Sequence, residues 1–491
     1  MSPTSRTKGL SRKGYENLTW RCYRIIAQIQ LFQNMFQLKK KIYENVPDSL
    51  KQLIRLVPYS LVAGRVYRDT LVLCRRFDKM SREEVLAYQE NELGKLLNFA
   101  VNEVPFYQPH RSAAERFTPF DALKDFPLLT KEDVQEHFKE LIPRSIDKIP
   151  YHKKTTGGSS GNQLTFLEDD TTYAREMAFM HSQWRRVGYS HNCRKATFRG
   201  VKFNKIRQGI FWQKNRIHNE LQFSPFHMSE HNLPLYIDKI KQYLPQFIHG
   251  YPSAVNVLAE YILRHNLADT LTPIKAILLG SESCSEAQRE RIEKAFNARV
   301  YTWYGHSERT VLGGECEKSK YYHSFPGYGI LEIIKQDGSP CEIGEHGEIV
   351  GTGFMNRSMP LIRYRTDDFA VRRDPHCECG RHWDRFCDVM GRWSIEGFVI
   401  GKNGSRISAA ALNMHGEVFK NVIRYQYYQK LKGELEIRVI VNPQFSEDDE
   451  KKIAYEHKKK LWSEMDIVVH RVDDIPLTKS GKQRRIICEI E

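Results

Sequence analysis

Helical and strand-like hydrophobic patterns alternate along most of the 491-residue chain. Between residues 81 and 106, apolar residues recur three or four positions apart among charged ones, which predicts a helix that stops at Val104-Pro105. An unbroken apolar run at 274–279 predicts a buried strand. A capped helix is expected next at 285–296, and a second strand at 299–303. This alternation is typical of an α/β fold.

The two strands and the helix between them have a consequence for ligand binding. Parallel strands of such a unit end on the same edge of a sheet, so the loops at 280–284 and 304–308 are expected side by side. Ligands of α/β proteins bind at that edge. We therefore look for chemistry in these two loops.

Beyond Gly391 the pattern changes to short strands around one helix, which is expected at 447–463. The strands are expected at 398–400, 435–441 and 466–472. The fold class predicted is α/β, with a large multi-sheet domain followed by a small α+β domain. The expected divisions are a basic helical extension at 1–80, the large domain at 81–391 and the small domain at 392–491.

Composition supports a globular protein of two or more domains. The chain is 41% hydrophobic, and its length exceeds what one compact core holds. No stretch approaches the ~20 apolar residues of a membrane span, and the N-terminus lacks a signal-peptide pattern. The ten cysteines are scattered, which suits a reducing compartment. We therefore expect a cytosolic protein.

The net charge of +15 is concentrated near the N-terminus. Residues 1–80 hold 16 lysines and arginines against 5 aspartates and glutamates, so 11 of the 15 positive charges lie there. Within this stretch, 20–42 has apolar residues at helical spacing beside basic ones. It is either a helix that lies on an anionic membrane at the inner face or an extension packed on the main domain. The balanced remainder disfavours nucleic acid as a partner.

A glycine- and hydroxyl-rich segment at 155–161 is the first candidate for chemistry. It holds Thr156, Gly157, Gly158, Ser159, Ser160 and Gly161. In such a loop, backbone N–H groups and hydroxyls can surround phosphate oxygens. The Gly-Lys-Ser/Thr ending of the common nucleotide P-loop is missing, which disfavours kinase or motor chemistry. Alone, the segment could equally be a plain flexible loop.

Three further segments change this interpretation, at 304–308, 363–368 and 476–482. With the glycine-rich segment they resemble, in order and spacing, the core motifs of the adenylate-forming superfamily of acyl-CoA synthetases, luciferases and peptide-synthetase adenylation domains. The closer resemblance is to the phenylacetate–CoA ligase and CapK (capsule biosynthesis) branch, from about residue 60 to the C-terminus. The segments that carry it are 102–107, 250–253, 279–282 and 377–381, with Gly391-Arg392.

The resemblance implies ATP-dependent activation of a carboxylic acid as its acyl-AMP. Attack of a carboxylate on a phosphate builds negative charge, so the reaction needs positioning and positive groups. Lys482 is implied to bridge the carboxylate and the α-phosphate. Ser307 is implied to contact the α-phosphate, and Glu308 to hold the Mg²⁺ carried by ATP. Outside the motif context, lone residues of these types would be ordinary surface groups.

The resemblance also implies a nucleotide site. Asp368 would accept the ribose hydroxyls and Tyr304 would stack on adenine, beside Gly305. The base would be lined by Gly280, Ser281 and Glu282. Arg392 would contact ribose or phosphate at the hinge, but Ser394-Ile395 replaces the acidic pair usual after it. This departure puts thioester formation, and CoA as acceptor, in question.

Two short segments offer four ligands of the type that zinc prefers, with Cys-x-Cys tighter than the usual spacing. They are Cys316, His323, Cys377 and Cys379. A structural Zn²⁺ and free thiols both remain open, with His306, His376, His382 and Cys387 as competing ligands.

The acyl site is expected between the 196–228 region and the turn at 249–253. Its candidate lining residues are Phe211, Trp212, His249 and Tyr251, which could equally be core residues. Arg, Lys and Asn in 199–220 point to a polar or anionic acid.

Three functions remain open: an acid–thiol ligase using CoA, a ligase with an amine or sugar acceptor in surface polysaccharide synthesis, and a scaffold without turnover. The presence of Glu308, Asp368 and Lys482 argues against the last.

Overall fold

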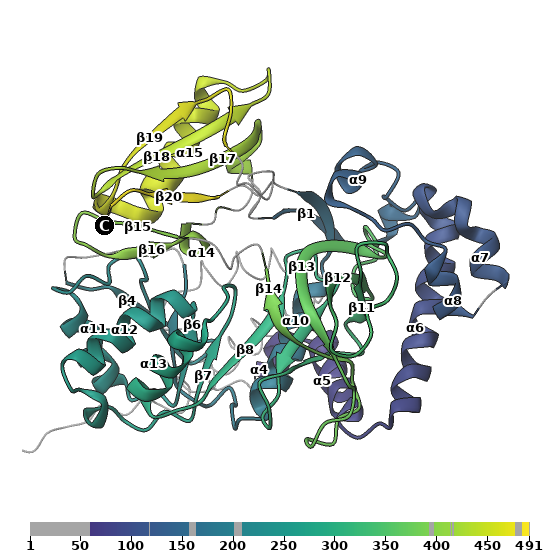
Figure 1. Ribbon diagram of the computed structural model, residues 1–491, viewed down its shortest axis with the longest axis horizontal. Helices are drawn as coiled ribbons and strands as arrows, with labels where there is room; N and C mark the ends of the chain where they lie inside the picture. The colour runs from purple at the N-terminus through teal and green to yellow at the C-terminus, as the bar shows by residue number, and fades with distance from the viewer. Residues whose placement is uncertain are drawn as a thin grey trace, which may run out of the picture.

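The computed structural model describes residues 59–116, 118–156, 164–200, 209–391, 397–412, 414, 417–476 and 484–490 (Figure 1). Several predictions fall outside these residues and stay predictions. They concern the basic stretch at 20–42, Gly157, Gly158, Ser159, Ser160, Gly161, Arg392 and Lys482.

The N-terminal part of the described chain is helical. Its helices are α4 (Tyr59–Ala63), α5 (Arg65–Phe77), α6 (Arg82–Glu103), α7 (Arg111–Arg116), α8 (Pro119–Lys124) and α9 (Lys131–Glu136). Ser81 begins α6 with a capping box, in which its side chain accepts from the Glu84 N–H and Glu84 accepts from the Ser81 N–H. The helix predicted at 81–106 therefore has the expected start and ends three residues earlier.

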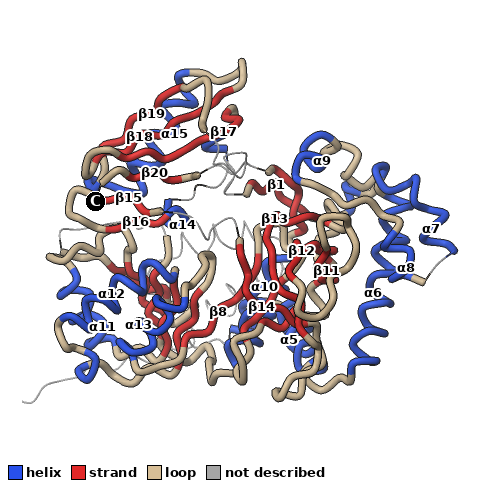
Figure 2. The backbone as a smooth tube through the Cα atoms, in the orientation of Figure 1, coloured by secondary structure: helices blue, strands red, loops and turns tan. Residues whose placement is uncertain are grey.

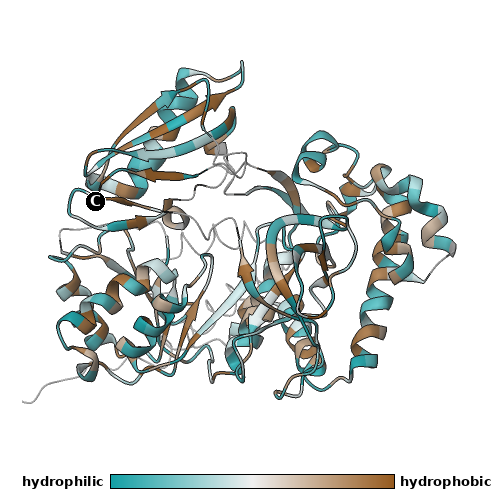
Figure 3. Cartoon of the chain, viewed as in Figure 1, coloured by the Kyte–Doolittle hydropathy of each residue, from teal (hydrophilic) through white to brown (hydrophobic). Residues whose placement is uncertain are grey.

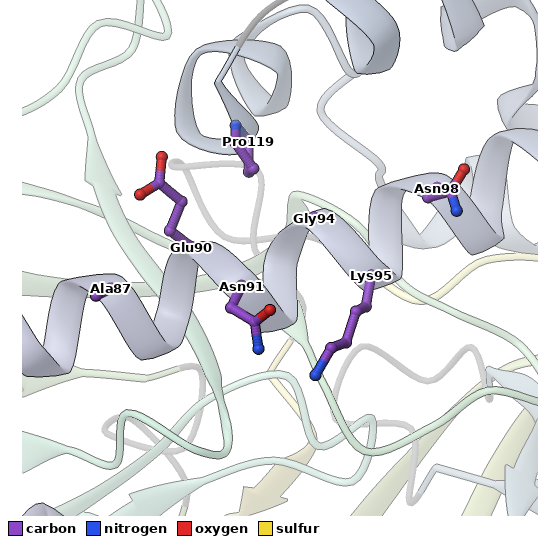
Figure 4. A pocket seen from close by; sticks show the side chains of 7 residues that line it. All are labelled: Ala87, Glu90, Asn91, Gly94, Lys95, Asn98 and Pro119. Atoms are coloured by element: carbon purple, nitrogen blue, oxygen red, sulfur yellow. The ribbon is translucent and has the colours of Figure 1, made fainter.

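Helix α6 forms one side of the molecule and contacts α8 at Gly94 (Figures 1 and 4). A Cβ on Gly94 would lie 3.2 Å from the Cγ of Pro119, the first residue of α8. The absence of a side chain thus lets the two helices approach. Glu90, Asn91 and Lys95 are among the residues that line a pocket beside Gly94 and Pro119 (Figure 4).

A sheet of twelve strands forms the centre of the large domain (Figure 2). Its order is β11-β12-β13-β14-β10-β9-β8-β7-β6-β3-β5-β4. The bounds are β3 (Lys195–Phe198), β4 (Trp212–Asn215), β5 (Glu220–Phe223), β6 (Phe247–Gly250), β7 (Ala276–Leu279), β8 (Val300–Gly305), β9 (Leu312–Glu315), β10 (Tyr322–Ser324), β11 (Gly329–Ile334), β12 (His346–Gly353), β13 (Tyr364–Arg373) and β14 (Arg385–Met390). Strands β5, β3, β6, β7 and β8 are parallel, and the other pairs are antiparallel.

Strand β7, in the middle of the parallel strands, is buried on both faces, which explains its continuous apolar run (Figure 3). Side chains alternate between faces, so Ile277 and Leu279 of β7 join the core under α11 (Leu233–Tyr243), α12 (Pro252–Arg264) and α13 (Glu286–Phe296). Ala276 and Leu278 point the other way, toward α10 (Thr172–Arg185) and α5. The predicted strand, helix and strand unit corresponds to β7, α13 and β8.

The small domain follows strand β14. A short hairpin, β15 (Phe398–Ile400) and β16 (Arg406–Ser408), leads through α14 (Ala409–Leu412) to a four-stranded sheet of order β19-β18-β17-β20. The remaining bounds are β17 (Val422–Gln429), β18 (Glu434–Val441), α15 (Glu447–Leu461), β19 (Asp466–Arg471) and β20 (Ile486–Cys488). Its buried residues are continuous with the core around α12, so the domain sits above that part of the sheet (Figure 1).

A separate hairpin of β1 (Tyr151–Thr155) and β2 (Thr165–Asp169) carries the glycine-rich segment. The predicted α/β class with a separate C-terminal domain is confirmed. Among the described helices, none has the length and apolar character of a membrane span.

A buried ion pair fixes α13 on the sheet. Arg289 of α13 donates to both carboxylate oxygens of Glu315 in β9, at 3.0 and 2.7 Å. We predict that Arg289→Met lowers the free energy of unfolding by about 3–5 kcal/mol, because it leaves a buried carboxylate without this partner. Urea denaturation measures the loss. Arg65→Met, which removes an exposed pair with Asp69, is the control and should change little; equal losses in both variants would contradict the prediction.

Candidate active site

A cavity of about 830 Å³ opens at the carboxyl edge of the parallel strands. The two loops singled out from the sequence, after β7 and β8, both line it. Helix α10, strand β13 and Lys460 of the small domain complete its wall. The expectation that these loops lie side by side is met.

Two tyrosines hold the two carboxylates predicted to bind the nucleotide. The Tyr304 hydroxyl donates to Asp368 Oδ2 at 3.0 Å, and the Tyr364 hydroxyl donates to Glu308 Oε1 at 2.9 Å. Burial raises the pKa of Tyr304 well above its usual value, with Asp368 adding to the rise, so the phenol stays a donor. All four side chains line the cavity, as does Ser307.

Glu308 has the chemistry of a ligand for a hard cation. Among the described residues its hydrogen-bond donor is Tyr364, which uses one carboxylate oxygen. The second oxygen is therefore available to an oxygen-preferring ion such as Mg²⁺. The residues present fit the metal predicted from the sequence.

Beneath these residues, Glu168 joins the hairpin to the loop after β8. Glu168 accepts from Lys154 at 2.8 Å and pairs with Arg309 at 3.2 Å, while Arg309 also pairs with Glu176 at 2.7 Å. Burial opposes ionisation, but the His152 hydrogen bond and the two cations lower the pKa of Glu168 to about 2. Lys154 also donates to the Ser307 carbonyl at 3.2 Å.

Thr156 closes the base of the glycine-rich segment. Its backbone N–H donates to the Leu164 carbonyl at 2.8 Å, and its hydroxyl accepts from the Leu164 N–H at 3.0 Å. It is buried and lines the cavity. The segment therefore starts and ends at one point of the wall.

The loop after β7 contributes two of its three predicted residues. Ser281 accepts from Arg199 at 2.7 Å, and Glu282 accepts from the N–H and hydroxyl of Ser253, each at 3.0 Å. Glu282 also accepts from the hydroxyl of Ser408, so it links α12 to the small domain. Burial raises the pKa of Glu282. Gly280 is not among the lining residues.

The predicted acyl residues divide into two pairs. His249 and Tyr251 line the cavity. Phe211 and Trp212 do not: Phe211 stacks with Tyr236 in the core, at 5.8 Å between ring centroids. Their assignment is corrected, because both belong to the β4 side of the sheet, where Trp212 packs beneath Lys239.

Several cavity residues were not singled out by sequence analysis, among them Lys154, Trp184, Lys195 and Arg309. Arg309 directly follows the motif at 304–308, and its φ of 57° marks an unusual backbone. No local pattern signals the other three, because their partners are distant in the chain.

The four predicted metal ligands lie together at the edge of the sheet. The ligand atoms of Cys316, His323, Cys377 and Cys379 are all within 4.8 Å of one another. Sγ of Cys316 is 3.8 Å from Sγ of Cys377, and Sγ of Cys379 is 3.3 Å from Nε2 of His323. Tetrahedral ligands about 2.0–2.3 Å from zinc are spaced in this way. The competing ligands are not part of this cluster and make other contacts. His306 is hydrogen-bonded to the Thr310 hydroxyl, Cys387 accepts from Arg373, and the rings of His376 and His382 lie side by side.

Comparison with known proteins supports the motif resemblance. CapK of Staphylococcus aureus is 26% identical over 443 residues, which cover 88% of this chain and 96% of CapK. The phenylacetate–coenzyme A ligase of Thermus thermophilus is 24% identical over 346 residues, covering 66% of this chain and 74% of the ligase. A family profile described as the CapK C-terminal domain matches residues 399–489. The chain resembles the adenylate-forming superfamily. Within that superfamily it is most similar in its motifs to the branch of CapK and the phenylacetate–CoA ligases.

A solved structure of this superfamily has the same fold. It is a 2-hydroxyisobutyryl-CoA ligase in complex with 2-HIB-AMP and CoA in the thioesterification state. The TM-score is 0.55 at 18% identity, over 84% of this chain and 91% of that chain. At this identity the likeness concerns the fold alone.

Gly280 matters for packing under the cavity. A Cβ at this position would lie 2.2 Å from the Trp303 ring. We predict that Gly280→Ala displaces this indole and lowers stability by about 1–3 kcal/mol, the usual cost of overpacking. Tryptophan fluorescence and thermal unfolding report the two effects. Gly397→Ala is the matched control, since its Cβ would have 3.6 Å of clearance, and an equal loss there would contradict the argument.

Proposed function

We propose that the protein activates a carboxylic acid with ATP, forming an acyl-adenylate and releasing pyrophosphate. One observation carries the proposal: Tyr304, Ser307, Glu308 and Asp368 line a single cavity with the base of the glycine-rich segment. Separate parts of the chain thus supply carboxylates, hydroxyls and cations to one space. Such positioned charge is what phosphoryl chemistry requires.

Each described group has a task in this proposal. Asp368, oriented by Tyr304, accepts the ribose hydroxyls, and Glu308 holds Mg²⁺, which would neutralise phosphate charge when bound. Lys154 holds the Ser307 backbone in place, so the Ser307 hydroxyl can face the α-phosphate. Arg392 and Lys482, outside the described residues, are proposed from the motif alone to contact the phosphate and the reacting oxygens.

The acceptor in the second step is proposed to be CoA, as in the relatives named phenylacetate–coenzyme A ligase. A second candidate is an amine or sugar hydroxyl. It is favoured by the extent of the match, since CapK aligns with 88% of this chain and the two ligases with 66% and 64%. A cytosolic location, with the basic stretch at 20–42 on an anionic membrane, also remains a proposal.

Lys482→Ala tests the first half-reaction. We expect pyrophosphate release to fall at least about 100-fold, the loss typical of one missing charge-stabilising group, with ATP binding largely kept. A pyrophosphate-release screen over aryl acids, amino acids and uronic acids supplies the substrate, and titration calorimetry supplies the affinity for ATP. Lys479→Ala, three residues earlier, is the control and should keep activity. Near-normal adenylation by Lys482→Ala would remove this lysine from the mechanism.

Repeating the screen with and without CoA distinguishes the two acceptors. Acid-dependent CoA consumption supports the thiol acceptor. Pyrophosphate release that CoA leaves unchanged, but an amine or sugar accelerates, supports the second candidate. Absence of release with every acid would contradict the proposed function.

We further propose that Cys316, His323, Cys377 and Cys379 hold a structural zinc ion. The site ties β9 and β10 to the segment that leads into β14.

We predict about one zinc ion per chain. Cys379→Ser should lose this zinc and have a lower melting temperature. Elemental analysis and thermal unfolding measure both. Cys488→Ser alters a half-buried thiol outside the cluster and should keep the metal; a metal-free native protein would contradict the proposal.

A further inference from the structure

The cavity extends beyond the residues assigned to the nucleotide. Those residues lie on β8 and β13 and in the loops after β1, β7 and β8. The wall continues with His249 of β6, Lys195 of β3 and Glu220 of β5. In the sheet order, β6, β3 and β5 lie successively farther from β8. This far end is closed by Trp184 of α10, and it is the space left for the acyl group.

The far end contains a buried ion pair. Nζ of Lys195 is 3.3 Å from Oε2 of Glu220, and the two residues are 4% and 7% exposed. Glu220 also accepts from Thr197, Asn215 and Gln222, which occupy both of its oxygens. Burial opposes its ionisation, but Lys195 and the other donors lower the pKa of Glu220. The Glu220 carboxylate is therefore favoured in its ionised form and has its hydrogen bonds satisfied.

The Lys195 ammonium has more N–H groups than its carboxylate partner can accept. Among the described residues, Glu220 is its only carboxylate partner, and its ammonium lies 4.9 Å over the Trp184 ring. An ammonium carries three N–H groups. At least one of them has no acceptor in the described wall, although the side chain lines the cavity.

His249 adds a second unpaired donor. Its Nε2 is 3.5 Å from Nη1 of Arg199 and so faces a donor. Burial, with the charges of Lys195 and Arg199, lowers the pKa of His249 well below its usual value. The neutral ring then carries its proton on Nδ1, and this buried atom has no hydrogen-bond partner among the described residues.

The indole N–H of Trp184 is the third donor without an acceptor in the described wall. Its Nε1–H is buried and likewise without a partner in the described part of the chain. Its ring lies 5.1 Å from that of His249, so the two unpaired N–H groups belong to one patch. His218, whose pKa burial lowers to about 4, adds another neutral polar ring to the same wall.

We infer that the acid activated here carries hydroxyl or carbonyl oxygens on its acyl chain, which accept from Lys195, His249 and Trp184. The inference rests on the proposed function and names its substrate class. Buried donors without acceptors are rare and costly in proteins, and a polar acyl chain would satisfy them. An unsubstituted alkyl or aryl acid would instead leave them unpaired and be disfavoured.

Acids with and without oxygen substituents on the acyl chain test the proposed substrate class. The rate constant kcat/KM for pyrophosphate release is compared for hexanoate, 6-hydroxyhexanoate, gluconate and glucuronate, with phenylacetate as the aryl acid. We expect at least one oxygenated acid to exceed the unsubstituted acids by about tenfold or more, since polar sites discriminate strongly against analogues that lack the polar group. Equal or better use of hexanoate and phenylacetate would overturn the inference.

Variants then locate the preference. His249→Phe and Trp184→Phe should each reduce the preference, measured as the ratio of kcat/KM for the oxygenated acid to kcat/KM for hexanoate. His249→Gln keeps a side-chain N–H and should retain part of the preference, which separates hydrogen bonding from packing. Tyr189→Phe is the matched control: its buried hydroxyl is also unpaired among the described residues, but it does not line the cavity.

The outcomes are distinct from those of the proposed function. If no acid releases pyrophosphate, the proposed function itself fails. If acids are activated but His249→Phe and Trp184→Phe, shown to be folded by thermal unfolding, keep the wild-type preference, the assignment of these donors fails while adenylation stands.

Discussion

The buried carboxylate of Glu168 is the group on which the geometry of the candidate site depends. It holds Lys154 and Arg309, one from each of two segments about 150 residues apart in sequence. A carboxylate left in this place without its cations would be strongly disfavoured, so the hairpin β1–β2 and the loop after β8 have to be positioned together. Thr156, at the start of the glycine-rich segment, and Glu308 thereby acquire a fixed relation.

A second carboxylate has a comparable role at the other side of the cavity. Glu282 accepts from Ser253 of α12 and from Ser408 of the small domain. The loop after β7 is thus bonded to both domains in this arrangement. Any rotation of the small domain has to replace the Ser408 hydrogen bond.

Local signals explain what could be predicted from the sequence. Ser285 was expected to begin a helix, and it does so with a capping box to Gln288. The strands at 276–279 and 398–400 and the four metal-type ligands came from equally local patterns, whereas the predicted site roles of Lys482 and Arg392 remain untested. By contrast, β17 was missed, although it forms a local antiparallel pair with β18; only its pairing with β20 joins residues about 60 positions apart.

The acyl wall shows why the remainder of the site escaped prediction. Phe211 and Trp212 are aromatic and close to the expected region, yet the strand register places them in packing contacts away from the cavity. Lys195 has no motif around it, and its importance arises only because β3 lies between β5 and β6, next to α10. Sequence motifs identify groups that act on the shared part of a substrate, the nucleotide. In the proposed function, the variable part, the acyl chain, would be recognised by side chains that only the sheet order brings together.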